Sequence, residues 1–458
     1  MERPATDLNR CPRCEELEKR VAELEKQVAS LMAKLEEEQR RNRRQAAPFS
    51  KGAPVANPKK PGRKKGKRHG PHAHRVVPSR IDERYEVPLP CQCPECGSKR
   101  LRKTGKVVQY QAEIPQQVIF RQFTSQTGEC RDCGQKVRGR HELQTSNAGG
   151  AAASQLGAGV HALLALLNKE LGLSHGKSVR LLKLMFPELQ LARSTSVRSV
   201  LRTAKRVEPA VKQLQADVRG APEVAPDETG WRVGGRSAWL HAFVSHNTTL
   251  YKIDPGRDHV PCETLLGSEW NGTLTHDGWS VYDRFTKASH QQCLAHLSRR
   301  CEKLIEAARG GAVHFPRAVL GLIDRAYALR RSWRGHRIGG DELAVQGLTL
   351  SCELEELCER RFQNRANRRL GKHILKHAMS WFWFLIDPSI QSTNHWAERA
   401  IRPAVVNRKV WGGNRTWIGA HAQTTLMSII QTAKQRALEP FTWIRKALTD
   451  TQPTLALR

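Results

Sequence analysis

Residues 223–254 read EVAPDETGWRVGGRSAWLHAFVSHNTTLYKID, and this stretch decides the fold class. Apolar and polar residues alternate along it, which is the period of β-strands with one buried face. The pair Gly234 and Gly235 interrupts the alternation, as expected at a hairpin turn. We therefore predict three consecutive strands in a meander, and a fourth strand in residues 272–279 (GTLTHDGW). Helical segments with aromatic residues and arginine should follow, from about residue 293 to 385.

Three carboxylates stand out beside these predicted elements. Asp227 is predicted to end the first strand and Asp277 the fourth, while Glu398 follows the helical interval. Each also has a plain structural explanation: Asp227 could cap a turn, Asp277 could begin a helix, and Glu398 could pair with Arg402 along a helix. Together they form a candidate site for hard divalent cations, which take oxygen ligands. The acidic residues that rank lower as ligands are Glu228, Asp283 and Asp387.

Glu398 is surrounded in the sequence by basic residues. It is the only acidic residue between Pro388 and Leu438, a span that also holds seven lysines and arginines. Two divalent ions can stabilise the attacking and the leaving oxygen of a phosphodiester, and basic neighbours can hold its phosphates. The predicted DNA contacts in this segment are Arg399, Arg402, Arg408 and Lys409.

The composition indicates a polyanion as partner. The chain of 458 residues carries 76 lysines and arginines against 44 acidic residues, a formal net charge of +32. Such a balance favours nucleic acid. The longest apolar runs, ALLALL from Ala162 and WFWFLI from Trp381, fall far short of the about 18 residues of a membrane span, so no membrane partner is expected. The first residues do not resemble a secretory signal, and we expect a cytoplasmic, nucleoid-associated protein.

A basic segment without acidic residues spans residues 39–81. It contains fourteen lysines and arginines together with proline and glycine, for example in KKPGRKKGKRHGPHAHR. This composition cannot bury enough apolar surface to offset the entropy lost on ordering. We predict a disordered basic arm over residues 41–85, either a solubilising linker or, as clustered cations favour, a DNA contact. The predicted phosphate contacts are Arg63, Lys64, Lys65, Lys67 and Arg68.

Residues 1–40 contain a short heptad pattern. Apolar residues recur in alternating steps of four and three with Glu and Lys between them, at Leu17, Val21, Leu24, Val28, Leu31 and Leu35. The pattern is typical of a coiled coil and predicts a homo-oligomer. An ordinary amphipathic helix is the alternative, because fewer than three full heptads are present. The pair Cys11 and Cys14 is left unassigned.

Two Cys-x-x-Cys-Gly motifs flank a strand-like segment within residues 86–145. CPECG supplies Cys93 and Cys96, and CRDCG supplies Cys130 and Cys133. Four thiolates at these spacings suit a structural tetrahedral Zn²⁺ site, which holds a fold together and performs no catalysis. We predict a zinc ribbon, with Cys91 as an alternative to Cys93.

Residues 155–215 show helical periodicity in three segments. The third, RSTSVRSVLRTAKRVEPAV, carries several arginines and lysines and should begin at a Ser or Thr N-cap. The three helices would form either a helix-turn-helix DNA reader or a plain packing unit. Farther along, Cys293 and His296 have a zinc-like spacing in CLAH, but one pair cannot complete a site, so a packing role is favoured.

Several motifs, taken in order, resemble those of DDE-type transposases of the insertion sequence 66 family, across nearly the whole chain. They are DET at 227–229, DGW at 277–279 with Tyr282, CLAH at 293–296, and TNHWAERAIRP leading into NRKVWGG. The zipper-like start, the basic arm, the cysteine ribbon and the closing PFTWIRKAL are also similar in order and position. The chain departs from the family where Asn394 is followed by His395 instead of a second asparagine, and in its lysine-rich arm.

The resemblance implies a multidomain protein of class α+β/α/β. An N-terminal coiled coil, a zinc ribbon and a helix-turn-helix-like domain would precede a ribonuclease-H-like catalytic domain over residues 220–440, with a helical insertion at about 297–385. A C-terminal helix or tail would occupy residues 441–458. Asp227, Asp277 and Glu398 would be the catalytic residues and hold two Mg²⁺ or Mn²⁺ ions, with His276, Arg399 and Arg402 as helpers around the metals or phosphates.

The implied activity is DNA transposition. Water would attack a phosphodiester at the end of a mobile element, and the resulting 3′-hydroxyl would attack target DNA, with no covalent protein intermediate. The implied partners are the element ends, the target DNA and small accessory proteins encoded by the same element. Two other functions stay open: a catalytically inactive DNA-binding relic or regulator, and a structure-specific nuclease that cuts DNA without joining it.

Overall fold

The computed structural model describes residues 12–43, 79–82, 84–86, 88, 90–91, 94–100, 102, 108, 117–139, 141–145, 155–307 and 310–450. The chain divides into two compact units, residues 1–119 and 120–458, and each is considered by itself. Among the helices in these ranges, none combines the length and the apolar character that a membrane crossing requires.

The first unit contains helix α1 (Pro12–Arg43). The heptad positions from Leu17 to Leu31 are each more than half exposed. A row of exposed apolar side chains is what a coiled coil needs for association, and self-association through α1 stays a prediction. The basic-arm contacts predicted at residues 63–68 lie outside the described residues.

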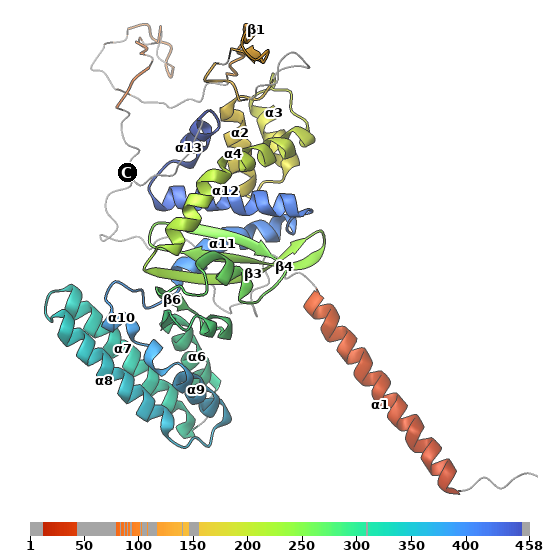
Figure 1. Cartoon of the computed structure of the whole chain (residues 1–458), viewed down its shortest axis with the longest axis vertical. Coiled ribbons are helices and arrows are strands. Elements are labelled where there is room, and N and C mark those ends of the chain that lie inside the picture. Colours follow the sequence, from red (N-terminus) through yellow and green to blue (C-terminus); the bar gives the residue numbers. More distant parts are fainter. Residues whose placement is uncertain are drawn as a thin grey trace, which may run out of the picture. The chain divides into compact units, whose positions relative to one another are not determined.

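A five-stranded mixed sheet forms the centre of the second unit (Figure 1). Its strands are β3 (Glu223–Val233), β4 (Arg236–Val244), β5 (Thr249–Asp254), β6 (Thr273–His276) and β7 (Ser289–Gln292), in the order β5-β4-β3-β6-β7. The first three form the predicted antiparallel meander, and the fourth strand is also confirmed. β6 pairs parallel with β3, and β7 with β6. The strand β7 was not predicted, because its sequence SHQQ has no apolar alternation.

Helices cover both faces of this sheet, because successive strand residues point to opposite sides. On one side, Val224 and Phe243 pack in a core with α4 (Arg193–Arg219) and α5 (Val260–Leu266). On the other side, Ala225 and Ala242 pack with α11 (His395–Trp411). Helix α12 (Trp417–Gln435) contacts β5 and α4 and contributes to both cores.

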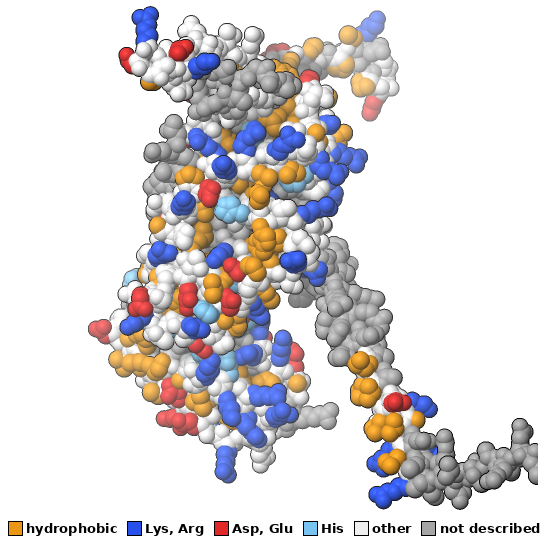
Figure 2. Space-filling view, turned by 45° about the vertical axis from the view of Figure 1, so that its right-hand side comes forward, with side chains coloured by type: hydrophobic (Ala, Val, Ile, Leu, Met, Phe, Trp, Pro, Cys, Tyr) orange, Lys and Arg blue, Asp and Glu red, His pale blue; other side chains and the backbone are white. Residues whose placement is uncertain are grey.

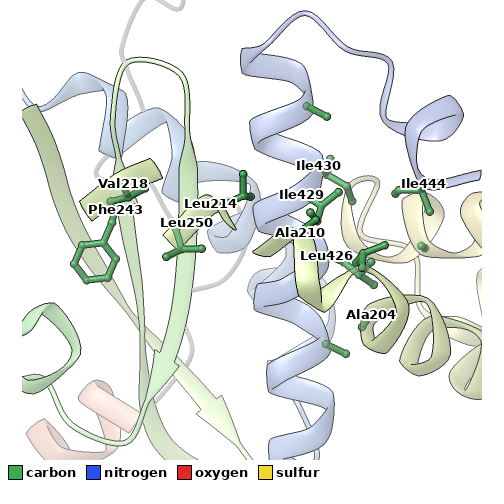
Figure 3. Close-up of a cluster of buried hydrophobic side chains, with 14 of the residues drawn as sticks. Ala204, Ala210, Leu214, Val218, Phe243, Leu250, Leu426, Ile429, Ile430 and Ile444 are labelled. Atoms are coloured by element: carbon green, nitrogen blue, oxygen red, sulfur yellow. The ribbon is translucent and has the colours of Figure 1, made fainter. Parts of the chain in front are cut away.

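Figure 3 shows how α4 links the sheet to the remaining helices. Val218 lies beside the strand residue Phe243, Leu214 lies between Leu250 and α12, and Ala204 lies on the side of Leu426 of α12. The core continues into α2 (Ala158–Lys169) and α13 (Pro440–Ala447), which pack together. The helical segment therefore shares one core with the sheet.

The three helices predicted for residues 155–215 are present as α2, α3 (His175–Met185) and α4. The predicted Ser or Thr N-cap of the third helix is wrong, because α4 begins after Ala192. A serine cap occurs instead at α3, where the Ser174 hydroxyl accepts a hydrogen bond from the Lys177 N–H. A DNA-reading role for these helices stays a prediction.

Between β7 and α11 the chain forms a helical region with a separate core. Its helices are α6 (Leu294–Ala307), α7 (His314–Arg334), α8 (Gly340–Glu359), α9 (Arg365–Lys376) and α10 (Trp383–Ile386). Leu297, Val319, Leu350 and Leu370 are among the buried residues of this core. The region is called the helical insertion below. A short hairpin, β1 (Thr127–Glu129) and β2 (Lys136–Arg138), lies earlier in the same unit.

Candidate active site

Strands β3 and β6 position the two aspartates. Their parallel pairing joins Glu223 to Thr273, and the same offset of 50 residues would place Asp227 level with Asp277. Asp277 directly follows β6, as predicted. The prediction that Asp227 ends its strand is wrong, because β4 continues to pair with β3 as far as Val233 after β6 has ended. Asp227 therefore lies just beyond the part of β3 that pairs with β6, where β3 still pairs with β4.

Helix α11 holds Glu398 in its first turn. The Glu398 N–H donates to the carbonyl of the N-cap residue Asn394 (3.2 Å). Asn394 is fixed from two sides, since its own N–H donates to Cys293 Sγ (3.3 Å) and its Nδ2 donates to the Pro226 carbonyl (3.4 Å). The beginning of α11 is thus tied both to the CLAH segment and to the residue before Asp227. Cys293 is buried and contacts Asn394, which agrees with the packing role expected for it in the CLAH segment.

Asp227 lies among negative charges. Burial, together with the nearby charges of Glu228, Asp277 and Glu398, raises the pKa of Asp227 to about 7. Asp277 and Glu398 are therefore close enough to Asp227 to raise its pKa. A divalent cation would offset this repulsion, and the all-oxygen donor set suits Mg²⁺ or Mn²⁺. Among the residues that the structure describes, no three His, Cys, Asp or Glu side chains converge closely enough to hold a metal ion.

The carboxylate of Glu398 contacts α6 and not Arg402. Its Oε1 accepts a hydrogen bond from Nη2 of Arg299 (2.8 Å) and lies 3.6 Å from Nε2 of His296. The helical ion pair with Arg402, considered as the plain explanation of Glu398, is not formed. Sequence reasoning missed Arg299, whose one local signal was its position three residues after His296, on the same helical face.

Glu228 binds an arginine that lies between two tryptophans. Its carboxylate accepts hydrogen bonds from Nη2 of Arg257 (2.8 Å) and from the Tyr282 hydroxyl (3.2 Å). The Arg257 guanidinium lies 4.5 Å from the ring centre of Trp239 and 4.7 Å from that of Trp279. Burial raises the pKa of Glu228, whose side chain is only 5% exposed. Through Arg257 and Tyr282, these contacts connect Glu228 of the DET segment to Trp279 of the DGW segment, which also contains Asp277.

His276 is fully buried next to Asp277. Its Nε2 lies 3.1 Å from Nδ1 of His290, and its Nδ1 accepts the N–H of Gly278 (3.2 Å). Gly278 has a φ of +91°, and a Cβ at this position would lie 2.9 Å from Oε1 of Gln292. His276 therefore supports the turn that presents Asp277, and its direct contact with metals or phosphates stays a prediction.

Three of the four DNA contacts predicted on α11 are exposed. These are Arg399, Arg402 and Lys409, and the first two border a shallow pocket of about 330 Å³. Arg408 is half-buried, and its guanidinium donates to the Gly230 carbonyl on β3. Arg408 therefore fastens α11 to the sheet, and DNA contact by the four residues stays a prediction.

The predicted zinc ligands are described only in part. Cys93 lies outside the described residues, and Cys96 belongs to the first unit. Cys130 and Cys133 lie in the turn between β1 and β2, which is closed by a hydrogen bond from the Gly134 N–H to the Cys130 carbonyl (2.9 Å). The N–H of Cys133 lowers the pKa of the Cys130 thiol, which favours the thiolate form that binds metal. The four-thiolate site stays a prediction.

Comparisons with known proteins give both a family and two relatives. The family model described as "Transposase IS66 family" matches residues 153–422, more than half of the chain. Uncharacterized protein y4qI of Sinorhizobium fredii (strain NBRC 101917 / NGR234) is 24% identical over 277 residues, 52% of this chain and 47% of the relative. Uncharacterized protein y4hP of the same strain is 22% identical over 405 residues, 80% of this chain and 71% of the relative.

The family match covers α2 to α4, the whole five-stranded sheet, the helical insertion and α11. It includes the positions of Asp227, Asp277 and Glu398. The chain spans about half the length of y4qI and somewhat more of y4hP. On the strength of the family match, the chain belongs to the IS66 transposase family.

Proposed function

We propose that this protein is a DNA transposase that binds the ends of a mobile element, cleaves a strand there and transfers the 3′-hydroxyl end to target DNA. The observation that carries the proposal is the proximity of Asp227, Asp277 and Glu398, which come from β3, from the end of β6 and from the first turn of α11. Burial raises the pKa of Asp227, and the charges of Asp277 and Glu398 add to this effect. Carboxylates gathered within a strongly basic chain suit metal-dependent phosphoryl transfer on DNA.

The topology of the sheet supports a ribonuclease-H-like catalytic domain. Three antiparallel strands are extended by two parallel ones, and the helical insertion lies between the last strand and α11. This agrees with the expectation from the family resemblance, as do the three helices before the sheet. The coiled coil of α1, the zinc ribbon and the DNA-reading role of α2 to α4 belong to the same proposal.

In this proposal, different residues bind the metal ions and the DNA phosphates. Asp227, Asp277 and Glu398 would hold two divalent ions, and Arg399 and Arg402 would hold DNA phosphates beside them. The bound ions would supply Lewis-acid stabilisation of the attacking and leaving oxygens. Cys293 and Asn394 keep the beginning of α11 in register with β3, which fixes the position of Glu398 relative to Asp227.

The test is nicking and strand transfer on DNA that carries the element's own terminal repeats, in Mg²⁺ or Mn²⁺. Glu398→Gln keeps the shape of the side chain and removes its charge. We expect it to bind DNA normally and to cleave more than about a hundredfold more slowly, because several kcal/mol of charge stabilisation are lost. The matched control is Glu356→Gln on α8, an exposed glutamate of the helical insertion. It should cleave like the wild type.

Equal cleavage by wild type and Glu398→Gln would show that the triad is wrong. Cleavage without joining would favour a structure-specific nuclease. If the wild type binds the repeats but does not cut them, the assay is repeated with the accessory proteins of the element. Continued inactivity would favour the DNA-binding relic or regulator.

A further inference from the structure

An exposed ion pair joins the helical insertion to Glu398. Arg299 of α6 is 53% exposed and Glu398 is 41% exposed, with 2.8 Å between Nη2 and Oε1. His296 adds a second contact to the same carboxylate oxygen, at 3.6 Å. Exposed ion pairs stabilise a fold only weakly, because water solvates both charges. The Glu398 carboxylate is therefore held by a partner that a stronger ligand can displace.

Arg299 belongs to a basic surface formed by two helices of the insertion. On α6, Lys303 lies one turn after Arg299. Arg300 lies near α9, where burial and the charge of Arg300 together lower the pKa of His373. On α9, Arg369 lies four residues before His373 and Lys376 lies three residues after it, so both share its face. The five residues Arg299, Arg300, Lys303, Arg369 and Lys376 are called the insertion basic face below.

Most of this basic face has no acidic partner. Arg300, Lys303 and Arg369 are exposed and form no ion pair with any residue that the structure describes. Lys376 pairs with Asp283. The acidic residues of α6, Glu302 and Glu306, lie three residues after Arg299 and Lys303, on the same flank of the helix, and form no ion pair with a described residue. Figure 2 shows Lys and Arg side chains gathered at the foot of the body, where α6 and α9 lie in Figure 1.

We propose that the insertion basic face binds the DNA backbone, and that Arg299 exchanges the Glu398 carboxylate for a DNA phosphate. DNA binding would then release Glu398 toward Asp227 and Asp277, so that the metal site is completed only with DNA in place. This inference rests on the proposed function. It explains why, among the described residues, the three carboxylates do not converge into a metal site while Arg299 holds Glu398.

The surface suits a phosphate backbone better than a protein partner. All five members have exposed cationic side chains, and Arg299 is the member that contacts Glu398. A guanidinium binds a phosphate in the same fork geometry as a carboxylate, so Arg299 can change partner without changing chemistry. Clustered Lys and Arg also gain affinity from the release of counterions from DNA.

The first experiment measures Mn²⁺ binding by calorimetry on the full chain without DNA. Arg299→Gln should bind Mn²⁺ about two- to fivefold more tightly than the wild type, because Glu398 is no longer occupied. Arg300→Gln is the matched control, since it removes the same charge from the next residue and leaves the Glu398 contact intact. Equal affinity of Arg299→Gln and Arg300→Gln would overturn the proposed exchange.

A third variant separates this inference from the proposed function. Glu398→Gln should weaken Mn²⁺ binding in the same titration. If it does, while Arg299→Gln binds Mn²⁺ no more tightly than Arg300→Gln, the triad stands and the exchange fails. If Glu398→Gln binds Mn²⁺ like the wild type, the proposed metal role of Glu398 fails, and the exchange fails with it.

The second experiment measures DNA binding against salt concentration. The triple variant Arg300→Gln, Lys303→Gln and Arg369→Gln should lower the slope of log affinity against log salt by about 0.9 for each DNA phosphate that the variant no longer neutralises. The control triple on the end of α7 and the following turn is Arg331→Gln, Arg334→Gln and Arg337→Gln, which removes the same total charge from exposed positions. Equal slopes for the two triples would overturn the assignment of the basic face to DNA.

Discussion

Lys169 is a buried lysine whose removal should stabilise the protein. It lies in the last turn of α2, only 5% exposed, and burial lowers its pKa from 10.5 to about 7. Its Nζ donates to Oε1 of Gln423 on α12 (2.7 Å) and lies 5.7 Å from the ring centre of Trp411. Lys169 forms no ion pair with a described residue. The acidic residue next to it in the chain, Glu170, pairs with Lys434.

The magnitude follows from the shift in pKa. A shift of about 3.5 units disfavours the charged folded form by about 5 kcal/mol at about 1.4 kcal/mol per unit. In Lys169→Met the side chain keeps its length and loses the charge, but Gln423 loses its donor, which costs about 1 to 3 kcal/mol. At about pH 6.5 we therefore expect the variant to be more stable by about 2 to 4 kcal/mol.

The pH dependence of the stability difference is the sharper test. The packing of wild type and Lys169→Met differs equally at both pH values, so packing does not affect the change with pH. A lysine with a lowered folded-state pKa contributes stability above its unfolded pKa, and this contribution is lost as the pH falls toward 7. Between about pH 6.5 and about pH 9 the wild type should gain about 2.5 kcal/mol relative to Lys169→Met. Other titrating groups are common to both proteins and do not enter the difference.

The assay is urea unfolding followed by far-UV circular dichroism at both pH values. Lys212→Met is the matched control, because Lys212 is an exposed lysine of α4. Its stability relative to the wild type should change by less than about 0.5 kcal/mol over the same range. If Lys169→Met shows no more pH dependence relative to the wild type than this control, Lys169 does not carry an uncompensated buried charge.

Four further predictions concern other parts of the chain. Gly413→Ala should lower the free energy of unfolding by about 2 to 3 kcal/mol, because φ is +111° and a Cβ would lie 2.4 Å from the Arg232 carbonyl oxygen. Gly321→Ala, where a Cβ would meet no described atom within 4 Å, should instead stabilise α7 by about 0.5 to 1 kcal/mol in the same unfolding assay. Since the pKa of Asp227 is about 7, Mn²⁺ affinity should fall up to about tenfold per pH unit below about pH 7, and a flat calorimetric profile would contradict this. Leu24→Lys should dissociate an α1-mediated oligomer in sedimentation experiments, and an unchanged sedimentation coefficient would count against the coiled coil.

The local sequence determined the elements that carry the site. The alternation in residues 223–254 and the Gly234–Gly235 turn were sufficient to predict the meander. Successive side chains of a strand point to opposite faces of the sheet, so its apolar pattern repeats every second residue. The apolar periodicity before it was sufficient for three helices. Asp277 was correctly placed at the end of a strand, and Glu398 was correctly placed on a helix.

The local sequence was insufficient where an element depends on its neighbours. The strand end predicted at Asp227 was wrong because pairing with β4 extends β3, and the pairing partner is not encoded in the strand itself. The Ser or Thr N-cap predicted for α4 was wrong because the helix begins at Arg193, before both Ser194 and Thr195, and its N-cap residue is Ala192. β7 was missed because its polar sequence forms a strand only beside β6.

By itself, the sequence determined which residues could carry charge, form strands or bind a cation, since these properties depend on residue type and short periods. Only the tertiary structure decided which of them meet. Arg299 and Glu398 are 99 residues apart in the chain, and Lys169 and Gln423 are 254 apart. The first pair forms where the hydrogen bond from Asn394 to Cys293 joins the beginning of α11 to that of α6, and the second forms where α2 and α12 share a core. No local pattern records which surfaces will meet in this way.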